Sequence, residues 1–127
     1  MDLAEAASEL KKVDGMAVTM PDGGRRLHAL GDLSDPDEDG IRMAKWVCGI
    51  VAYEKEWQVV PPPIFTGGPF PAPVVPTLQD AVDLTRHFFH VRAGFKELDP
   101  LDVQAEISRV YGEWAKERGV DSKMELY

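Results

Sequence analysis

Apolar side chains near the N-terminus recur with the period of an α-helix. Leu3, Leu10 and Val13 fall on one face together with two alanines, so the pattern predicts a short amphipathic helix over residues 2–13. A glycine at position 15 ends the pattern, as glycine commonly does just beyond a helix.

The following stretch favours strands. Residues 16–20 and 25–30 are rich in long apolar and β-branched side chains, and Pro-Asp-Gly-Gly stands between them. Such a turn between two apolar segments predicts a β-hairpin. A lone hairpin is only marginally stable, so we expect it to pack on helices or to pair with a further strand.

Two helices are predicted in the last third of the chain. One runs over residues 78–93, with Thr77 as its N-cap and Gly94 just beyond its end. The other runs over residues 100–118, with Asp99 as its N-cap and Pro100 at its first helical position. Only a few residues connect the two, which predicts an antiparallel helical hairpin.

The segment after Pro36 is interpreted as a further helix over residues 36–56, because its apolar positions trace one helical face. Gly40 and Gly49 each weaken that helix by about 1 kcal/mol relative to alanine. The alternative is a strand through residues 46–53, since valine, isoleucine, tryptophan and tyrosine all favour strands.

The acidic stretch that precedes this segment has two interpretations. Asp35, Asp37 and Asp39 stand in the Asp-x-Asp-x-Asp-Gly spacing that opens a calcium-binding loop. The twelfth position of that loop, which requires a glutamate, is Trp46. The favoured interpretation is therefore a helix start, with Asp35 as N-cap and proline at the first helical position.

Residues 61–76 contain seven of the ten prolines of the chain. Proline lacks the amide donor and restricts φ, so we expect neither a helix nor a central strand here but an extended arm. Its five large apolar side chains require a surface to cover, and the arm either folds back over its own domain or covers another chain. In the second case they are the predicted partner-binding residues: Ile64, Phe65, Phe70, Val74 and Val75.

These elements predict one small domain over residues 1–127, of the α+β class and predominantly α. It has an N-terminal helix and hairpin, three longer helices and a long proline-rich arm. At 127 residues, with 44% hydrophobic and 28% charged residues, the composition is that of a globular domain with its own core.

The net charge of −8 argues against nucleic-acid binding, which depends on lysine and arginine at phosphates. No apolar run reaches the roughly 20 residues that span a membrane, and Met-Asp-Leu-Ala-Glu does not resemble a signal peptide. We therefore expect a cytoplasmic protein, or part of a particle assembled in the cytoplasm. The single cysteine, Cys48, lies in an apolar stretch and is interpreted as a buried small hydrophobe.

Catalytic chemistry has weak support. Asp83, His87 and His90 share a helical face and are ligand types of open metal sites, but Phe88 and Phe89 lie between the histidines, and a surface role for them is favoured. No nucleophile elbow, phosphate-binding loop or dinucleotide fingerprint occurs in the sequence. No cofactor is predicted.

The sequence therefore favours a non-catalytic interaction or assembly subunit, such as a virion or tail-type component or an accessory subunit of a larger complex. Its partner would be another protein or a second copy, bound through the proline-rich arm and a helical face. The first alternative is an acidic stoichiometric inhibitor, of the immunity or anti-defence kind, that blocks a basic enzyme. The second is a metal-dependent enzyme using Asp83, His87 and His90.

Overall fold

The computed structural model describes residues 1–67 and 69–127. Within them, six strands form one antiparallel sheet whose order follows the chain, β1-β2-β3-β4-β5-β6. The strands are β1 (Met16–Thr19), β2 (Arg26–Leu33), β3 (Ala44–Tyr53), β4 (Glu56–Val60), β5 (Pro71–Val75) and β6 (Met124–Leu126). The helical segments are α1 (Leu3–Lys11), α2 (Pro21–Gly24), α3 (Ile64–Gly67), α4 (Leu78–His90), the 3-10 helix η1 (Arg92–Phe95) and α5 (Pro100–Arg118).

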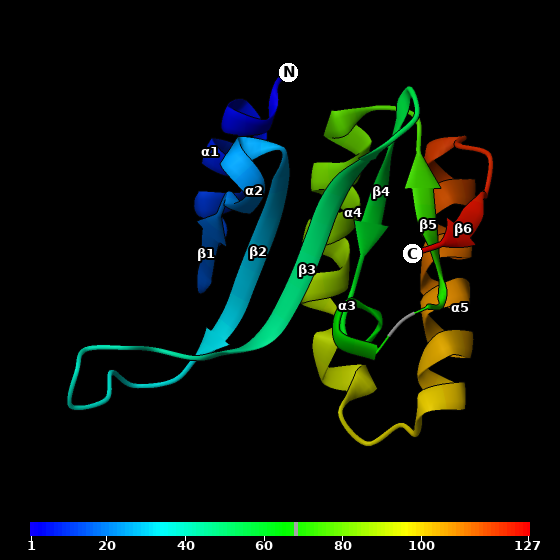
Figure 1. The fold of residues 1–127 in the computed structure, drawn as a ribbon. Helices are drawn as coiled ribbons and strands as arrows, with labels where there is room; N and C mark the ends of the chain where they lie inside the picture. Colours follow the sequence, from blue (N-terminus) through cyan, green and yellow to red (C-terminus); the bar gives the residue numbers. More distant parts are fainter. Residues whose placement is uncertain (68) are drawn as a thin grey trace.

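The expectation of a predominantly helical domain is wrong, because the sheet is the organising layer of the molecule. Figure 1 shows α1, α4 and α5 behind the sheet, with short α3 near the lower end of β3 and β4. The core lies between sheet and helices and joins side chains such as Leu27, Ile50, Val59, Leu84 and Ile107, all fully buried. Burial of this apolar layer is the main contribution to stability.

The predicted N-terminal helix and β-hairpin are confirmed. Helix α1 begins with a capping box between Asp2 and Glu5. Strands β1 and β2 pair antiparallel, from Met16 opposite Gly31 to Thr19 opposite His28. Three successive residues of the connecting turn have positive φ, among them Asp22 at 57°, which is the conformation that the glycines of this turn favour.

The two C-terminal helices are confirmed as an antiparallel pair. The Thr77 hydroxyl accepts from the Asp80 amide at the start of α4, and Asp99 caps α5. Arg118, at the end of α5, forms ion pairs with α4 through its guanidinium, at 2.8 Å from Asp80. The predicted end of the first helix is wrong: α4 stops at His90, and Gly94 lies inside η1.

The helix predicted over residues 36–56 is wrong, and the alternative strand is present as β3. Every second side chain of β3 faces the helices: the rings of Trp46 and Phe89 lie 5.0 Å apart, and the Cys48 thiol meets Thr85 of α4. Gly49 faces the opposite side, where a Cβ would lie 3.0 Å from the Phe65 ring. A strand satisfies both faces because its side chains alternate, whereas a helix would bury only one stripe.

Residues 61–76 contain a short helix, α3, and a strand of the sheet, β5, which corrects the expectation that proline excludes both. Strand β5 lies between β4 and β6. The Val74 amide donates to Lys123 on the β6 side, so alternation turns Pro71 and Pro73 toward β4. Among the described residues of β5, β4 pairs with Val74 and Val75 alone, so no residue of β4 lies opposite the amide donors that Pro71 and Pro73 lack.

Candidate functional site

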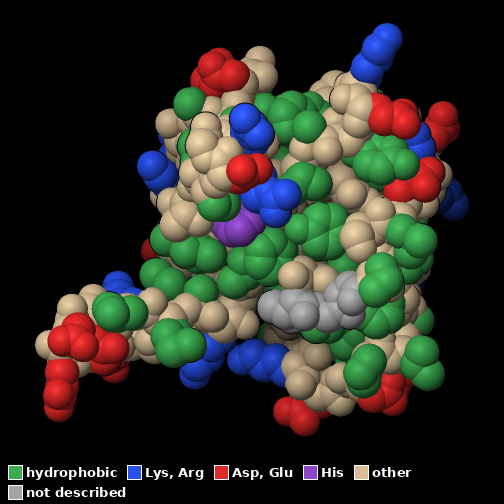
Figure 2. All heavy atoms as spheres, viewed as in Figure 1, with side chains coloured by type: hydrophobic (Ala, Val, Ile, Leu, Met, Phe, Trp, Pro, Cys, Tyr) green, Lys and Arg blue, Asp and Glu red, His purple; other side chains and the backbone are tan. Residues whose placement is uncertain are grey.

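Residues 34–43 leave the body of the molecule as a long loop between β2 and β3, here named the acidic projection. It is the cyan loop at the left of Figure 1, and Figure 2 shows red acidic side chains gathered at its far end. No helix begins at Asp35, so the predicted N-cap is wrong. All residues from Asp35 to Met43 are exposed to solvent.

Hydrogen bonds hold the acidic projection in one shape. At its root the Ser34 amide donates to the Met43 carbonyl at 2.8 Å, and the Ser34 hydroxyl accepts from the Met43 amide. At its tip the Asp37 carboxylate accepts from the amides of Asp39 and Ile41, both at 2.9 Å. Asp37 therefore stabilises a turn by side-chain capping, and the ordered shape lowers the entropy lost on docking.

Two large apolar side chains of the acidic projection stand in water. Ile41 is 59% exposed and Met43 is 73% exposed. Single exposed apolar residues are common on protein surfaces. Two of them on one structured loop, beside four carboxylates, form a compact amphipathic surface that resembles a docking element rather than a linker.

A cleft of about 640 Å³ opens at the root of the acidic projection, and we name it the basic cleft. Its walls come from the end of β2, the start of β3, the Pro62-Pro63 turn and the connection between α4 and α5. It is lined by Asp32, Leu33, Lys45, Trp46, Pro62, Pro63, Arg92, Phe95, Lys96, Leu98 and Val103.

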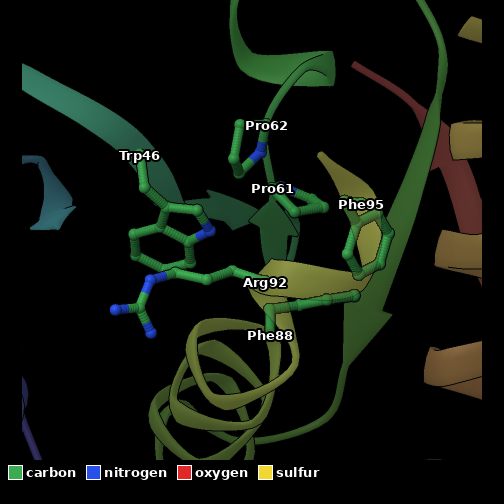
Figure 3. A pocket seen from close by; sticks show the side chains of 6 residues that line it. All are labelled: Trp46, Pro61, Pro62, Phe88, Arg92 and Phe95. Carbon is green, nitrogen blue, oxygen red and sulfur yellow. The ribbon is translucent and has the colours of Figure 1, made fainter. Parts of the chain in front are cut away.

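The inner end of the basic cleft is a narrow apolar pocket of about 30 Å³. Figure 3 shows the Trp46 and Phe95 rings on opposite sides of this pocket, with the side chains of Pro61 and Pro62 above and Arg92 and Phe88 below. This pocket is too small for a cofactor. The cleft as a whole has the size and the aromatic lining of a binding site for a small molecule or for a few side chains.

Positive charge dominates the basic cleft. Among the described residues that line it, Asp32 is the only carboxylate, and it forms a two-pronged ion pair with Arg92 at 2.9 and 3.0 Å. This hydrogen-bonded pairing, with the nearby charges of Arg92, Lys96 and Lys45, lowers the pKa of Asp32 below its ordinary value. Three cations thus surround one carboxylate in a protein whose net charge is −8.

The backbone at Asp32 is held in an uncommon conformation. Its φ is 52°, the left-handed region that aspartate tolerates better than most residues. The register of β2 and β3 places Asp32 opposite Lys45, while the side chain reaches Arg92 beyond the end of α4. Arg92 also lies 3.8 Å from the centre of the Phe89 ring. The ion pair therefore fastens one wall of the basic cleft to the other.

The predicted partner-binding residues lie mostly inside the domain. Ile64, Val74 and Val75 are 2%, 1% and 0% exposed. Phe65 and Phe70 are half-buried and pack against the core, and the Phe65 ring meets His28 edge-on with centroids 4.6 Å apart. The proline-rich segment thus covers its own sheet. The outward face of α5 carries charged side chains such as Arg109 and Glu113, which pair with each other.

The predicted metal ligands do not converge on one point. Asp37 uses its carboxylate to cap the turn, and Asp35 and Asp39 flank it in solvent. Asp83 forms ion pairs with Arg86 and Arg118, at 3.2 and 3.0 Å. His87 is half-buried and His90 is exposed. Among the described residues, no group of three or more acidic, histidine or cysteine side chains is arranged to hold a metal ion.

Cys48 and His28 are the remaining groups with reactive chemistry. Cys48 is fully buried, as predicted, and burial raises the pKa of its thiol to about 12. Among the described residues, the Nε2 atom of His28 is buried without a hydrogen-bond partner, and the imidazole packs against Phe65 of α3. Burial and, to a lesser degree, the charge of Arg26 lower the pKa of His28. In the part of the chain that the structure describes, neither group has the neighbours that a nucleophile or a general base requires.

Sequence reasoning missed the basic cleft. Its cations come from positions 45, 92 and 96, which no local motif connects. For the acidic projection the turn residues Ser34, Pro36 and Gly40 were a usable signal, but the helical spacing that follows them outweighed it.

Comparisons with protein-family models, with curated proteins and with solved structures find no match to this chain. In the part of the chain that the structure describes, none of the helices has the length and apolar character needed to cross a bilayer.

Proposed function

We propose that the protein is a non-catalytic interaction module that joins a larger assembly through the acidic projection. The observation that carries this proposal is the exposure of Ile41 and Met43 on a hydrogen-bonded loop that stands clear of the domain. Apolar anchors that are ordered before binding lose little entropy on docking and dominate the energy of an interface. The proline-rich segment supports the sheet instead of contacting the partner.

The test compares two variants in the native source. A double Ile41→Asp and Met43→Asp variant is expected to leave the native complex and to elute at the size of the free chain. Leu126→Asp is the matched control, because Leu126 is 68% exposed on β6, at the opposite edge of the sheet from β1, and does not line the basic cleft. If the double variant remains in a complex of wild-type size, the proposal is wrong.

A second function is favoured by the charge at the tip. Asp35, Glu38 and Asp39 are exposed, and among the described residues none of these three carboxylates forms an ion pair. An acidic inhibitor would present such a tip to a basic enzyme. In that case Glu38→Lys would slow association strongly and high salt would have the same effect, whereas Ile41→Asp would change association little.

A further inference from the structure

The basic cleft and the acidic projection are complementary in charge and in polarity. The cleft combines Lys45, Lys96 and Arg92 with the apolar surfaces of Trp46 and Phe95. The projection combines four carboxylates with Ile41 and Met43. A ligand for this cleft must carry negative charge beside apolar side chains, and the chain itself contains such a segment.

The cleft retains unneutralised charge. Asp32 pairs with Arg92, while among the described residues Lys45 and Lys96 take part in no ion pair and are exposed. Two lysines on the rim of an aromatic cleft attract an anionic segment, and their partial desolvation by a docked ligand strengthens that attraction.

The acidic projection cannot fill the cleft of its own chain in this conformation. The hydrogen bonds between Ser34 and Met43 hold its two sides together at the root, and the loop extends away from the domain (Figures 1 and 2). With about five residues on each side of the turn, the loop reaches roughly 15 Å from its root. Its tip is therefore available to another molecule.

Symmetry favours a second copy as that molecule. Leu33 and Lys45 flank the acidic projection and also line the basic cleft, so donor and acceptor surfaces adjoin each other on every copy. A twofold axis beside this junction would form both contacts at once, with the projection of each copy in the cleft of the other.

We propose that the basic cleft binds the acidic projection of a second copy of this chain, so that two copies form a reciprocal dimer. This inference rests on the proposed function and names the partner of the projection. Each copy contributes one acidic tip and one basic cleft. Ile41 and Met43 pack near the Trp46 and Phe95 rings, and the carboxylates of the tip pair with Lys45 and Lys96.

A charge exchange between two variants tests the proposal on the purified full-length chain. Variant one carries Lys45→Glu and Lys96→Glu in the cleft. Variant two carries Glu38→Lys and Asp39→Lys in the projection and keeps Asp37, which caps the turn. Sedimentation velocity between roughly 1 and 200 µM should show a wild-type dimer and at least a tenfold weaker association of either variant alone.

Mixing the variants should restore the dimer. In the mixed pair the acidic tip of variant one meets a basic cleft, and the basic tip of variant two meets an acidic cleft, so both contacts are attractive. A misfolded variant could not restore association in this way. The control Lys55→Glu with Lys116→Glu changes the net charge as variant one does, at exposed positions outside the cleft, and should leave the dimer intact.

Three results would overturn the inference: a monomeric wild type over the whole range, a dimer that neither variant weakens, or variants that dissociate and do not recombine. The failure of the proposed function is a separate result. A purified monomer whose native complex is lost on Ile41→Asp and Met43→Asp keeps the interaction role and rejects only the second copy as partner.

Discussion

The acidic projection and the proline-rich segment are the two most unusual stretches of this chain, and they have opposite fates. Residues 34–43 leave the sheet between β2 and β3 and stand in solvent. Residues 61–76 contain seven prolines, yet they supply β5 and place Ile64, Val74 and Val75 in the core. Both segments connect elements of one sheet, and only the second is part of the hydrophobic core.

The difference shows that apolar content, more than proline content, decides whether an irregular segment is packed. Burial of a valine or isoleucine contributes roughly 1.5–3 kcal/mol, while a proline costs nothing where its missing donor faces no partner strand. The acidic projection has Ile41 and Met43 but four carboxylates beside them. Burying the carboxylates would cost far more free energy than burial of the two apolar side chains would contribute.

The largest difference between the two segments should appear in stability when one aspartate is introduced into each of them. Val74→Asp puts a carboxylate at a site that is 1% exposed, and we expect the domain to unfold at neutral pH because a buried unpaired charge costs several kcal/mol. Ile41→Asp, at 59% exposure, should change the free energy of unfolding by less than about 0.5 kcal/mol. Urea denaturation followed by circular dichroism measures both, and similar values for the two would remove the distinction.

The core between the sheet and α4 is so closely packed that a single added methyl group should lower the free energy of unfolding. A Cβ at Gly31 would lie 2.4 Å from the Phe89 ring and 3.3 Å from Trp46, so Gly31→Ala should cost about 1–3 kcal/mol. Gly112→Ala is the control: it lies within α5 and meets nothing within 4 Å. This control should stabilise by about 0.5–1 kcal/mol, since alanine is the better helix former. A neutral Gly31→Ala in the same denaturation experiment would contradict the packing argument.

One hydroxyl group fastens β5 to its surroundings. The Tyr111 hydroxyl donates to the Val74 carbonyl at 2.9 Å and accepts from the Lys123 amide at 3.0 Å. Tyr111→Phe removes both bonds and should lower the free energy of unfolding by about 1–2 kcal/mol. Hydrogen exchange at the amides of Val74 and Lys123 should accelerate, while exchange in the acidic projection should not change. Unchanged protection of β5 would show that the hydroxyl is dispensable.

The smallest effect concerns the pH dependence of stability and His28 of β2, which packs against Phe65 of α3. The pKa of His28 is lowered below 6.5 in the folded protein, so between its folded and unfolded pKa values the unfolded chain binds more protons. The contribution of neutral His28 to the free energy of unfolding should therefore be complete above about pH 6.5 and should decrease as the pH falls toward the folded pKa. His28→Leu should remove this part of the pH dependence between pH 7 and 5.5. Parallel profiles of the free energy of unfolding against pH for wild type and variant would contradict this role of His28.

Local patterns were sufficient for the elements whose ends carry capping residues. Thr77 and Asp99 each cap the helix that was predicted to start there, and the Pro-Asp-Gly-Gly turn marks the hairpin of β1 and β2. In these places the signal lies within a few residues and depends on backbone donors that every helix or turn leaves unpaired.

Local patterns failed where two interpretations were locally equivalent. Asp35-Pro36 has the same chemistry as Asp99-Pro100, yet only the second starts a helix. The stretch from Trp46 to Tyr53 fits one face of a helix and both faces of a strand. Pairing with β2 on one side and β4 on the other decided for the strand, because a sheet position satisfies the backbone and buries alternate side chains at once.

The amino-acid sequence by itself determined the caps of α4 and α5, the first hairpin, the burial of Cys48 and the acidic character of the chain, since each of these depends on neighbouring residues or on composition. Only the tertiary structure decided that β3 and β5 are strands, that the proline-rich segment is internal and that residues 34–43 project. It alone also assembled the basic cleft, because Lys45, Arg92 and Lys96 meet through the contact of β3 with the end of α4. Long-range pairing and burial have no local signature, and they outweigh local propensities that differ by only about 1 kcal/mol.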